Sequence, residues 1–247
     1  MKTFPNPSSA FAVFSAGFLA VIGLFSVAEA ADRIAWIDNF SESPMKLELT
    51  EAGNLTQSGL LGGGSLFAAG ARTVLLDATD TPPARRATAE VLDSFSKYFF
   101  SVGPGVQASS VLRYEAPPTG PLDLTMGNAA NALGFTLDYS QTAVNIEVTV
   151  ETPGQPSMTV SKIQSAVENP TDVVFPYELF EGVNFNASSA ISVRLSQVAG
   201  AGSPDLVASG ISLMKVETAA VPEPSVALLA VGGLALALRR RRSDGEQ

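Results

Sequence analysis

The sequence predicts an all-β fold, an antiparallel β-sandwich, between two apolar terminal segments. Segments in which apolar and polar residues alternate recur along residues 31–220. An alternation with a period of two places the apolar side chains on one face of a strand. Clusters of Gly, Pro, Asn, Asp and Ser separate these segments, as they do in sandwiches and barrels. The sequence has no internal repeat, which argues against a solenoid or a propeller.

The individual strands are expected from this alternation. Residues 144–151 alternate without error, and the turn at 153–156 leads to a partner strand at 158–163. Residues 191–196 alternate in the same way. Weaker strands are expected at residues 33–37, 46–49, 73–77, 97–102, 109–114, 171–175 and 211–216. Residues 198–205 contain two glycines followed by Ser, Pro and Asp, and they predict a flexible hairpin loop.

Two further segments allow predictions, one about the direction of side chains and one about backbone conformation. Residues 135–139 alternate, so Phe135, Leu137 and Tyr139 are expected to face the core, with the two residues between them outward. Residues 82–92 begin with two prolines and contain good helix formers, with an Arg–Glu pair four residues apart. This second segment suits a short surface helix, and the tertiary environment can equally hold it extended, so both conformations stay open.

The first thirty residues predict a signal peptide. Lys2 supplies a positive charge, residues 11–27 are apolar, and small residues stand at Ala28 and Ala30. This pattern fits a signal-peptidase site, with cleavage before Ala31. A retained membrane anchor is the alternative. Either interpretation implies export through the inner membrane, with signal peptidase as a partner in the first.

The carboxyl-terminal segment has three parts. Pro222, Glu223 and Pro224 precede an apolar run at residues 226–238. Four arginines follow the run: Arg239, Arg240, Arg241 and Arg242. Thirteen helical residues span about 20 Å, whereas a full membrane span needs about twenty residues. The arginine cluster resists translocation and holds its end of the helix in the cytoplasm. An ordinary tail anchor or a buried helix is the alternative.

This order of motif, apolar helix and basic cluster closely resembles the PEP-CTERM sorting signal, over residues 221–242, with a polar end at 243–247. The resemblance implies an exported protein of a Gram-negative bacterium that makes exopolysaccharide. It also implies that an exosortase reads the motif while a single transmembrane helix holds the chain in the inner membrane. The protein is then expected at the cell surface or in the extracellular (biofilm) matrix.

Residues 31–220 have a resemblance of their own. The residues that carry it are Ile37-Asp38-Asn39-Phe40, Leu61-Gly62-Gly63 followed by Ala71-Arg72-Thr73-Val74, Leu122-Asp123-Leu124-Thr125, residues 173–180, Asn184-Phe185 and Ala190-Ile191. They resemble a surface domain that often precedes this sorting signal and that looks like the jelly-roll sandwich of carbohydrate-binding modules. The inserted residues 64–70 depart from that pattern. The resemblance implies no activity.

Composition excludes several classes of function. Residues 31–220 contain ten Lys or Arg residues and twenty Asp or Glu residues, which argues against nucleic acid and anionic lipid as partners. The chain has no His and no Cys, so Ser-His-Asp and Cys-His catalysis, His-ligated zinc and disulfides are excluded. Paired carboxylates suffice for a glycosidase. Residues such as Glu147 and Glu151, however, are expected on exposed strand faces.

The remaining candidates concern ions and sugars. No cofactor is expected, and a structural calcium ion is kept open. Its candidate ligands near strand ends are Asp32, Asp38, Asp77, Asp80, Asp123 and Asp205. Tyr114 and Tyr177 are the better exposed candidates for stacking on a sugar, whereas Trp36 is expected in the core. Residues 62–65 predict a flexible surface loop, because the lysine of a phosphate-binding loop is missing.

The sequence therefore predicts an exported, non-enzymatic structural or exopolysaccharide-associated protein. An extracellular glycan-active hydrolase that uses paired carboxylates is the alternative.

Overall fold

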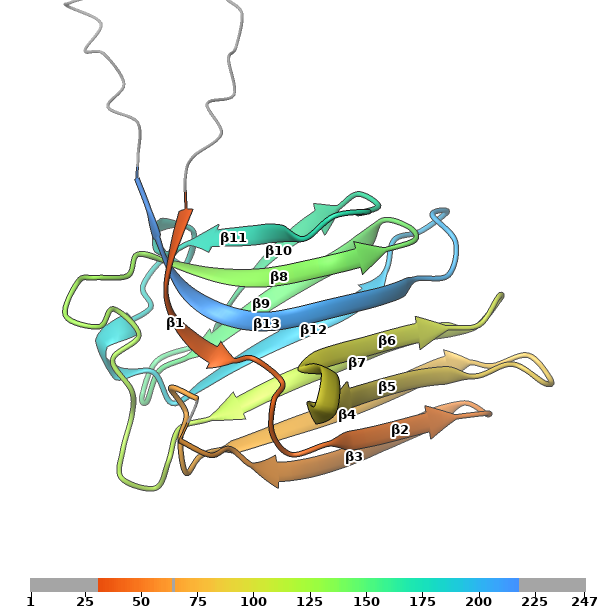
Figure 1. Cartoon of the computed structure of the whole chain (residues 1–247), viewed down its shortest axis with the longest axis horizontal. Coiled ribbons are helices and arrows are strands. Elements are labelled where there is room, and N and C mark those ends of the chain that lie inside the picture. The colour runs from red at the N-terminus through yellow and green to blue at the C-terminus, as the bar shows by residue number, and fades with distance from the viewer. Residues whose placement is uncertain (1–30, 64, 218–247) are drawn as a thin grey trace, which may run out of the picture.

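The computed structural model describes residues 31–63 and 65–217, which form two packed β-sheets (Figure 1). Within these residues, sheet A consists of β1 (Ala31–Asp38), β2 (Met45–Leu49), β5 (Ala87–Leu92), β6 (Lys97–Val102), β8 (Ala132–Ser140), β11 (Thr171–Pro176) and β13 (Asp205–Val216). Sheet B consists of β3 (Gly53–Leu60), β4 (Ala71–Asp80), β7 (Gln107–Glu115), β9 (Val144–Glu151), β10 (Met158–Gln164) and β12 (Ala190–Gln197). Three short 3-10 turns complete the set: η1 (Asp93–Phe95), η2 (Tyr177–Leu179) and η3 (Phe185–Ala187).

The strands are antiparallel throughout both sheets. The order in sheet A is β11-β8-β13-β6-β5-β2, and β1 pairs with the second half of β13 beside the end of β6. The order in sheet B is β10-β9-β12-β7-β4-β3. The predicted all-β antiparallel sandwich is thus confirmed. The predicted hairpin of residues 144–151 and 158–163 is also confirmed, as β9 and β10.

The predicted terminal signals lie outside the described residues. These are the signal peptide at residues 1–30, the sorting motif with its helix and arginine cluster at 221–242, and the polar end at 243–247. Within the part of the chain that the structure describes, no helix is both long enough and apolar enough to cross a membrane.

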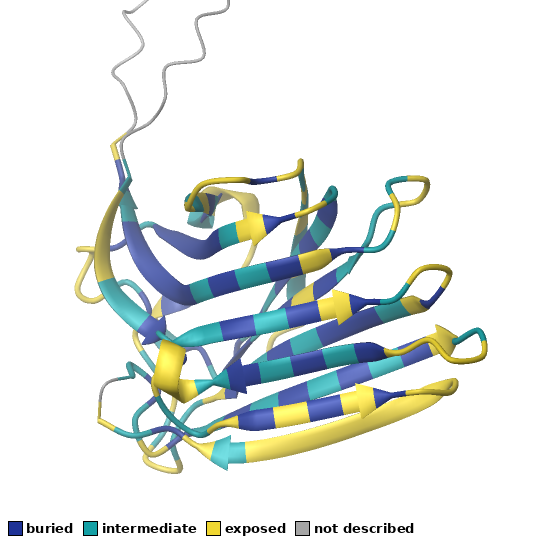
Figure 2. Cartoon of the chain, turned by 45° about the vertical axis from the view of Figure 1, so that its right-hand side comes forward, coloured by how far each residue is buried: buried dark blue, intermediate teal, exposed yellow. Residues whose placement is uncertain are grey.

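The core lies between the two sheets and follows the alternation in the sequence. Buried and less buried residues alternate along the central strands (Figure 2). In β9, for example, Val144, Ile146, Val148 and Val150 are at most 2% exposed. Burying such side chains stabilises the fold by about 1.5–3 kcal/mol each. One main core therefore holds the two sheets together. A small second cluster consists of Ala132, Met214 and Val216.

Residues 82–92 are a turn followed by strand β5, and the helical alternative is wrong. The Arg86–Glu90 pair of that helix does not form. Arg86 instead reaches Glu48 at 3.4 Å, and Glu90 reaches Lys46 at 3.9 Å, both across the strand pair β2–β5. Strand pairing, with Ala87, Ala89 and Val91 in the core, outweighs local helix propensity here.

Two other features differ from the prediction. The sequence did not predict strand β3, because residues Gly53–Leu60 show no apolar alternation. The hairpin loop predicted at residues 198–205 is wrong, since β12 belongs to sheet B and β13, which begins at Asp205, belongs to sheet A. This segment therefore crosses from one sheet to the other.

Candidate functional site

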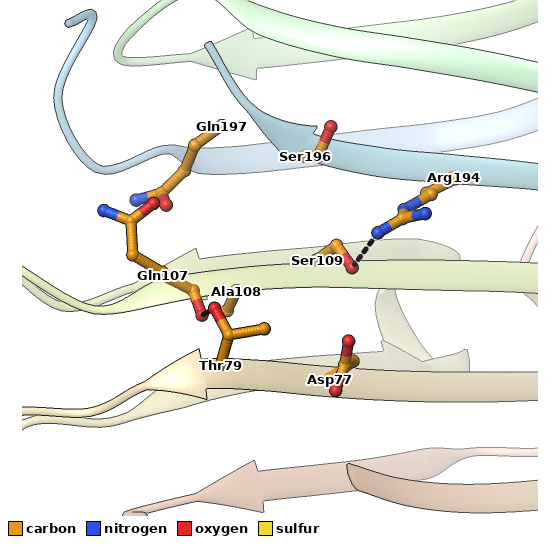
Figure 3. A pocket seen from close by; sticks show the side chains of 8 residues that line it. All are labelled: Asp77, Thr79, Gln107, Ala108, Ser109, Arg194, Ser196 and Gln197. Atoms are coloured by element: carbon orange, nitrogen blue, oxygen red, sulfur yellow. Dashed lines mark hydrogen bonds between the residues drawn. The ribbon is translucent and has the colours of Figure 1, made fainter. Parts of the chain in front are cut away.

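The outer face of sheet B has a polar pocket of about 160 Å³ at one end of the sheet (Figure 3). It is lined by Asp77 and Thr79 of β4, Gln107, Ala108 and Ser109 of β7, and Arg194, Ser196 and Gln197 of β12. A neighbouring pocket of about 260 Å³ shares the two glutamines and continues along residues 198–203. Ligand pockets are commonly about 300–1,000 Å³. These hollows therefore suit one polar group of a ligand better than a whole small molecule.

The pocket offers hydrogen-bonding groups and few charges. The guanidinium of Arg194 donates to Ser109 Oγ at 3.2 Å, and Gln197 Nε2 donates to the carbonyl of Val106 at 2.9 Å. Among the described residues, neither Arg194 nor Asp77 takes part in an ion pair. Asp77 is the one carboxylate in the lining, so the pocket does not bring together the acid and base of a glycosidase.

Elsewhere on sheet B, a pair of carboxylates is held by an arginine. Arg113 of β7 binds Glu151 of β9 in a bidentate pair and also reaches Glu115 at 3.1 Å. Hydrogen bonding from Arg113 holds the pKa of Glu151 below its ordinary value. A glycosidase acid needs the opposite shift, because it must carry a proton near neutral pH. Glu147 and Glu151 lie on the outer face of β9, half-buried.

Sheet A has an apolar row on its outer face that the sequence did not indicate. Val207 of β13 lies opposite both Phe99 of β6 and Tyr139 of β8 in the strand register. Phe99 points outward because both of its neighbours along β6 are buried in the core. Tyr139 is 43% exposed, while Phe99 and Val207 are half-buried. We call Phe99, Val207 and Tyr139 the apolar row.

The inward position predicted for Tyr139 is wrong, and a β-bulge is the reason. Phe135 and Leu137 face the core as predicted. Beyond Leu137, however, β8 has one more residue than β13 between successive pairs, and this extra residue is Asp138. A bulge of this kind turns the following side chain to the other face. It depends on pairing with β13, so the alternation within β8 does not reveal it.

Polar pairs flank the apolar row. The ammonium group of Lys97 lies 2.7 Å from the carboxylate of Asp138, and this contact spans β13 from β6 to β8. On the other flank, Ser101 donates a hydrogen bond to Asp205, its partner across β6 and β13. An apolar strip bordered by hydrogen-bonding groups matches a pyranose ring, which has apolar C–H faces and a rim of hydroxyl groups.

The aromatic residues singled out by the sequence are unavailable as stacking surfaces. Tyr114 is fully buried, and Tyr177 stacks on Phe185 with ring centroids 3.8 Å apart. Trp36 lies across Gly210 on the outer face of sheet A, and the guanidinium of Arg33 covers it at 3.9 Å from the ring centroid. The prediction for Tyr114 and Tyr177 is wrong. The core position expected for Trp36 is wrong as well, because its half-buried ring lies on the outer face of sheet A.

Asp38 and Arg72, two of the residues that carry the resemblance to a surface domain, form a buried ion pair at 2.5 Å. Their side chains are 3% and 0% exposed. Arg72 also donates to the carbonyls of Glu42 and Ser43, and Tyr114 donates its hydroxyl to Asp38 at 3.0 Å. Burial, followed by the charge of Asp38, raises the pKa of Tyr114, so the hydroxyl remains a donor. This cluster joins β1 of sheet A to β4 and β7 of sheet B and has a structural role.

The glycine-rich segment after β3 is anchored to this cluster. The amide of Gly62 donates to Glu42, Ser65 Oγ donates to the carbonyl of Ile37, and Phe67 is fully buried. Gly62, Gly63 and Ser65 form a loop as predicted, with Gly63 exposed, and the contacts above attach this loop to the rest of the domain. Burial of Phe67 further along the segment is the feature that fixes it.

Other residues that carry this resemblance form a second packed cluster, in the loops around residues 122–127 and 177–185. Tyr177 donates its hydroxyl to the carbonyl of Leu124 at 2.7 Å, and Phe180 packs edge-on against Phe185 at 5.6 Å. Asp123 accepts hydrogen bonds from Thr125 and from a nearby backbone amide, which lowers its pKa. These residues therefore pack a loop region rather than line a surface site.

The aspartates considered for calcium lie apart from one another. Asp32 is exposed on β1, Asp77 and Asp80 lie along β4, and Asp205 begins β13. Among the described residues, no three Asp or Glu side chains come together as a metal site would require. The remaining two candidates, Asp38 and Asp123, are already engaged as described above.

Comparison with known proteins adds no assignment. No family model matches the chain, and no curated protein matches it. The family 11 carbohydrate-binding module of the cellulosomal cellulase Lic26A-Cel5E of Clostridium thermocellum matches with 8% identity and a TM-score of 0.37, over 78% of this chain and 98% of that chain. A family 30 carbohydrate-binding module matches with 10% identity and a TM-score of 0.36, over 70% and 99%. TmCBM61 in complex with beta-1,4-galactotriose matches with 13% identity and a TM-score of 0.31, over 49% and 70%. Similarities this low carry neither a ligand nor a site residue over to this chain.

Proposed function

We propose that the chain is an exported cell-surface or extracellular-matrix protein whose sandwich binds polysaccharide without chemically altering it. The two terminal segments of the sequence support export and sorting. The apolar row with its polar flanks carries the binding proposal. The row places apolar side chains beside charged and hydroxyl groups, which are the two kinds of contact that a sugar ring needs.

In this arrangement each part of the row has its own role. Tyr139, the most exposed of the three, packs against the C–H face of one sugar ring, and Phe99 extends that surface two strands away, about 10 Å. Asp138 and Asp205 accept hydrogen bonds from sugar hydroxyls, and Lys97 donates to them. No step of this recognition requires proton transfer or a covalent intermediate.

Binding to a glycan array tests the proposal with variants of the row. Tyr139→Ala and Phe99→Ala are expected to weaken binding roughly tenfold each, because each removes an aromatic contact worth about 0.5–1.5 kcal/mol plus its buried area. Ile163→Ala is the matched control, since Ile163 is 66% exposed on the opposite face. Unchanged binding by both row variants would exclude the row as the site.

A hydrolysis assay on the same glycans distinguishes binding from catalysis. The proposal expects no turnover. Turnover that disappears in a single carboxylate variant, such as Asp77→Asn or Glu151→Gln, would instead establish a glycan-active hydrolase. The ionised state of Glu151 beside Arg113 disfavours that outcome.

Sorting is tested separately from binding. We propose that an exosortase reads Pro222-Glu223-Pro224 while Arg239 to Arg242 hold the helix end in the cytoplasm. Replacing the three motif residues by alanine is expected to leave a longer, membrane-retained form in cells that contain the processing enzyme. Normal processing of that variant would refute this assignment and would leave the binding proposal untouched.

A further inference from the structure

Strand β3 is the least covered strand of the sandwich. It forms the end of sheet B and, among the described residues, pairs only with β4. Seven of its eight residues are exposed, and Leu60 is 73% exposed. Figure 2 shows this strand exposed along most of its length. The carbonyl of Leu60 accepts a hydrogen bond from Ser43 Oγ. The rest of the free side presents backbone N–H and C=O groups that are able to accept another strand.

The other edge strands have features that oppose such pairing. The short strand β2 has charged side chains, and the backbone N–H of Lys46 donates to the side chain of Gln57 of β3 at 3.2 Å. At the opposite side of the sandwich, Lys162 of β10 donates to the carbonyl of Val174 on the edge strand β11. Strand β11 also ends at Pro176, which lacks an N–H donor. Charges, short length and proline are the devices that protect sheet edges from association.

Strand β3 lacks all of these devices. Its sequence, Gly-Asn-Leu-Thr-Gln-Ser-Gly-Leu, contains no charged residue and no proline over eight residues. The whole chain has 24 acidic and 15 basic residues, a net charge of −9. Two copies of such a chain repel each other over most of their surface. An uncharged strand is the edge at which a second copy meets no like charge directly opposite.

We propose that two copies of this chain associate by antiparallel pairing of β3 with β3, about a two-fold axis. Such an interface uses the same strand from each copy and closes on itself, as dimer interfaces commonly do. It joins the two B sheets into one continuous sheet and supplies partners for the free backbone groups of both edges. Sheet A, with the apolar row, stays outside the interface.

The two-fold axis makes a prediction about register. Residues directly opposite in an antiparallel pair point to the same face of the sheet. With two identical strands, one residue must therefore lie opposite its own copy, with the two Cβ atoms about 4.5–5.5 Å apart. Asn54, Thr56 and Ser58 share the outer face of sheet B and bracket the middle of β3. One of these positions, or a neighbour on the same strand, lies nearest the axis.

The chain contains no cysteine, so single cysteines report on this contact without background. The experiment uses the full chain with Asn54→Cys, Thr56→Cys or Ser58→Cys, oxidised and analysed on non-reducing gels. Ser161→Cys is the control, because Ser161 is exposed on the same face but on edge strand β10. A disulfide requires the two Cβ atoms to lie about 3.5–4.5 Å apart, so association through other parts of the chain does not produce it at β3.

The expected result is a disulfide-linked dimer at one β3 position, with a yield about tenfold above Ser161→Cys and falling on either side of that position. Thr56→Lys in the wild-type background is expected to convert the dimer to a monomer in light scattering, because like charges then face each other across the axis. Equal yields at β3 and β10 would overturn the proposal. A monomeric wild-type chain would overturn the proposal as well. This holds even if hydrogen exchange shows that the β3 amides are protected, because another segment or partner would then cover β3. Glycan binding by the Thr56→Lys monomer separates this proposal from the one for sheet A.

Discussion

The two outer faces of the sandwich differ in how their side chains are used. On sheet B, Arg113 and Glu151 bind each other, and the pocket near Arg194 is lined by hydroxyl and amide groups. On sheet A, the ion pair of Lys97 and Asp138 stands beside an apolar row rather than among other polar groups. In both sheets, the outward residues alternate along the strands with residues that are buried in the same core. Folding alone therefore does not require the outer faces to differ.

The contrast shows which part of the pattern folding determines. Alternation requires an apolar side chain at every inward position and leaves the outward positions free. Scattered exposed apolar residues are normal, whereas a row across three adjacent strands is a contiguous feature. Under the proposed function, the outward chemistry of sheet A serves binding, and its flanking polar pairs fit that role.

The largest expected effect comes from cutting the link between the sheets. Arg72→Ala leaves Asp38 buried without its partner, which is expected to lower the free energy of unfolding by about 3–5 kcal/mol. For a domain of this size, that corresponds to a fall in Tm of roughly 10 °C. Unfolding can be followed by the fluorescence of Trp36, the one tryptophan of the chain.

Arg86→Ala is the matched control for that experiment. Its partner Glu48 lies 3.4 Å away, but the Arg86 side chain is 68% exposed. Exposed pairs contribute only about 0–1 kcal/mol. Similar losses in the two variants would contradict the structural role of the buried pair. Such a result would also mean that the ion pair of Asp38 does not hold the two sheets together.

A smaller effect is expected at Gly210, where the outer face of sheet A is tightly packed. A Cβ at this position would lie 2.3 Å from Cζ3 of Trp36 and 2.7 Å from the carbonyl of Asp38. Gly210→Ala is therefore expected to cost about 1–3 kcal/mol, because the backbone carbonyl cannot move aside easily. Gly63→Ala is the control, since a Cβ there meets nothing within 4 Å. Equal stability of both variants would show that Trp36 does not pack tightly against Gly210.

The pair on sheet B predicts a pH effect of at most about 1 kcal/mol, because both side chains are 34% exposed. Arg113 lowers the pKa of Glu151 from its ordinary value of 4.5. The stabilisation is therefore fully present above pH 4.5 and is lost as the pH falls through the lowered pKa. Glu151→Gln should be less stable than the wild type at neutral pH, and the two should converge as the pH falls below the lowered pKa of Glu151. A difference that persists in acid would point to a packing effect instead.

The sequence predicted the inward half of the molecule better than its outer faces. Strands such as β9 and β12 follow from alternation, because burial demands it at each inward position. Tyr139 was misplaced because the bulge at Asp138 arises from pairing with β13, a contact about seventy residues away in the chain. Strand β3 was missed because both of its faces are exposed, so no alternation marks it.

The smallest expected effect on stability is at the apolar row itself. Tyr139 is 43% exposed and its side chain makes no hydrogen bond among the described residues, so Tyr139→Ala should change the free energy of unfolding by only about 0.5 kcal/mol. Ile163→Ala on sheet B should behave alike, since both residues are exposed apolar side chains. Equal stability combined with unequal glycan binding would separate the two faces by function alone. A large loss of stability for Tyr139→Ala would instead make the row part of the packing, and its exposure would then need no ligand to explain it.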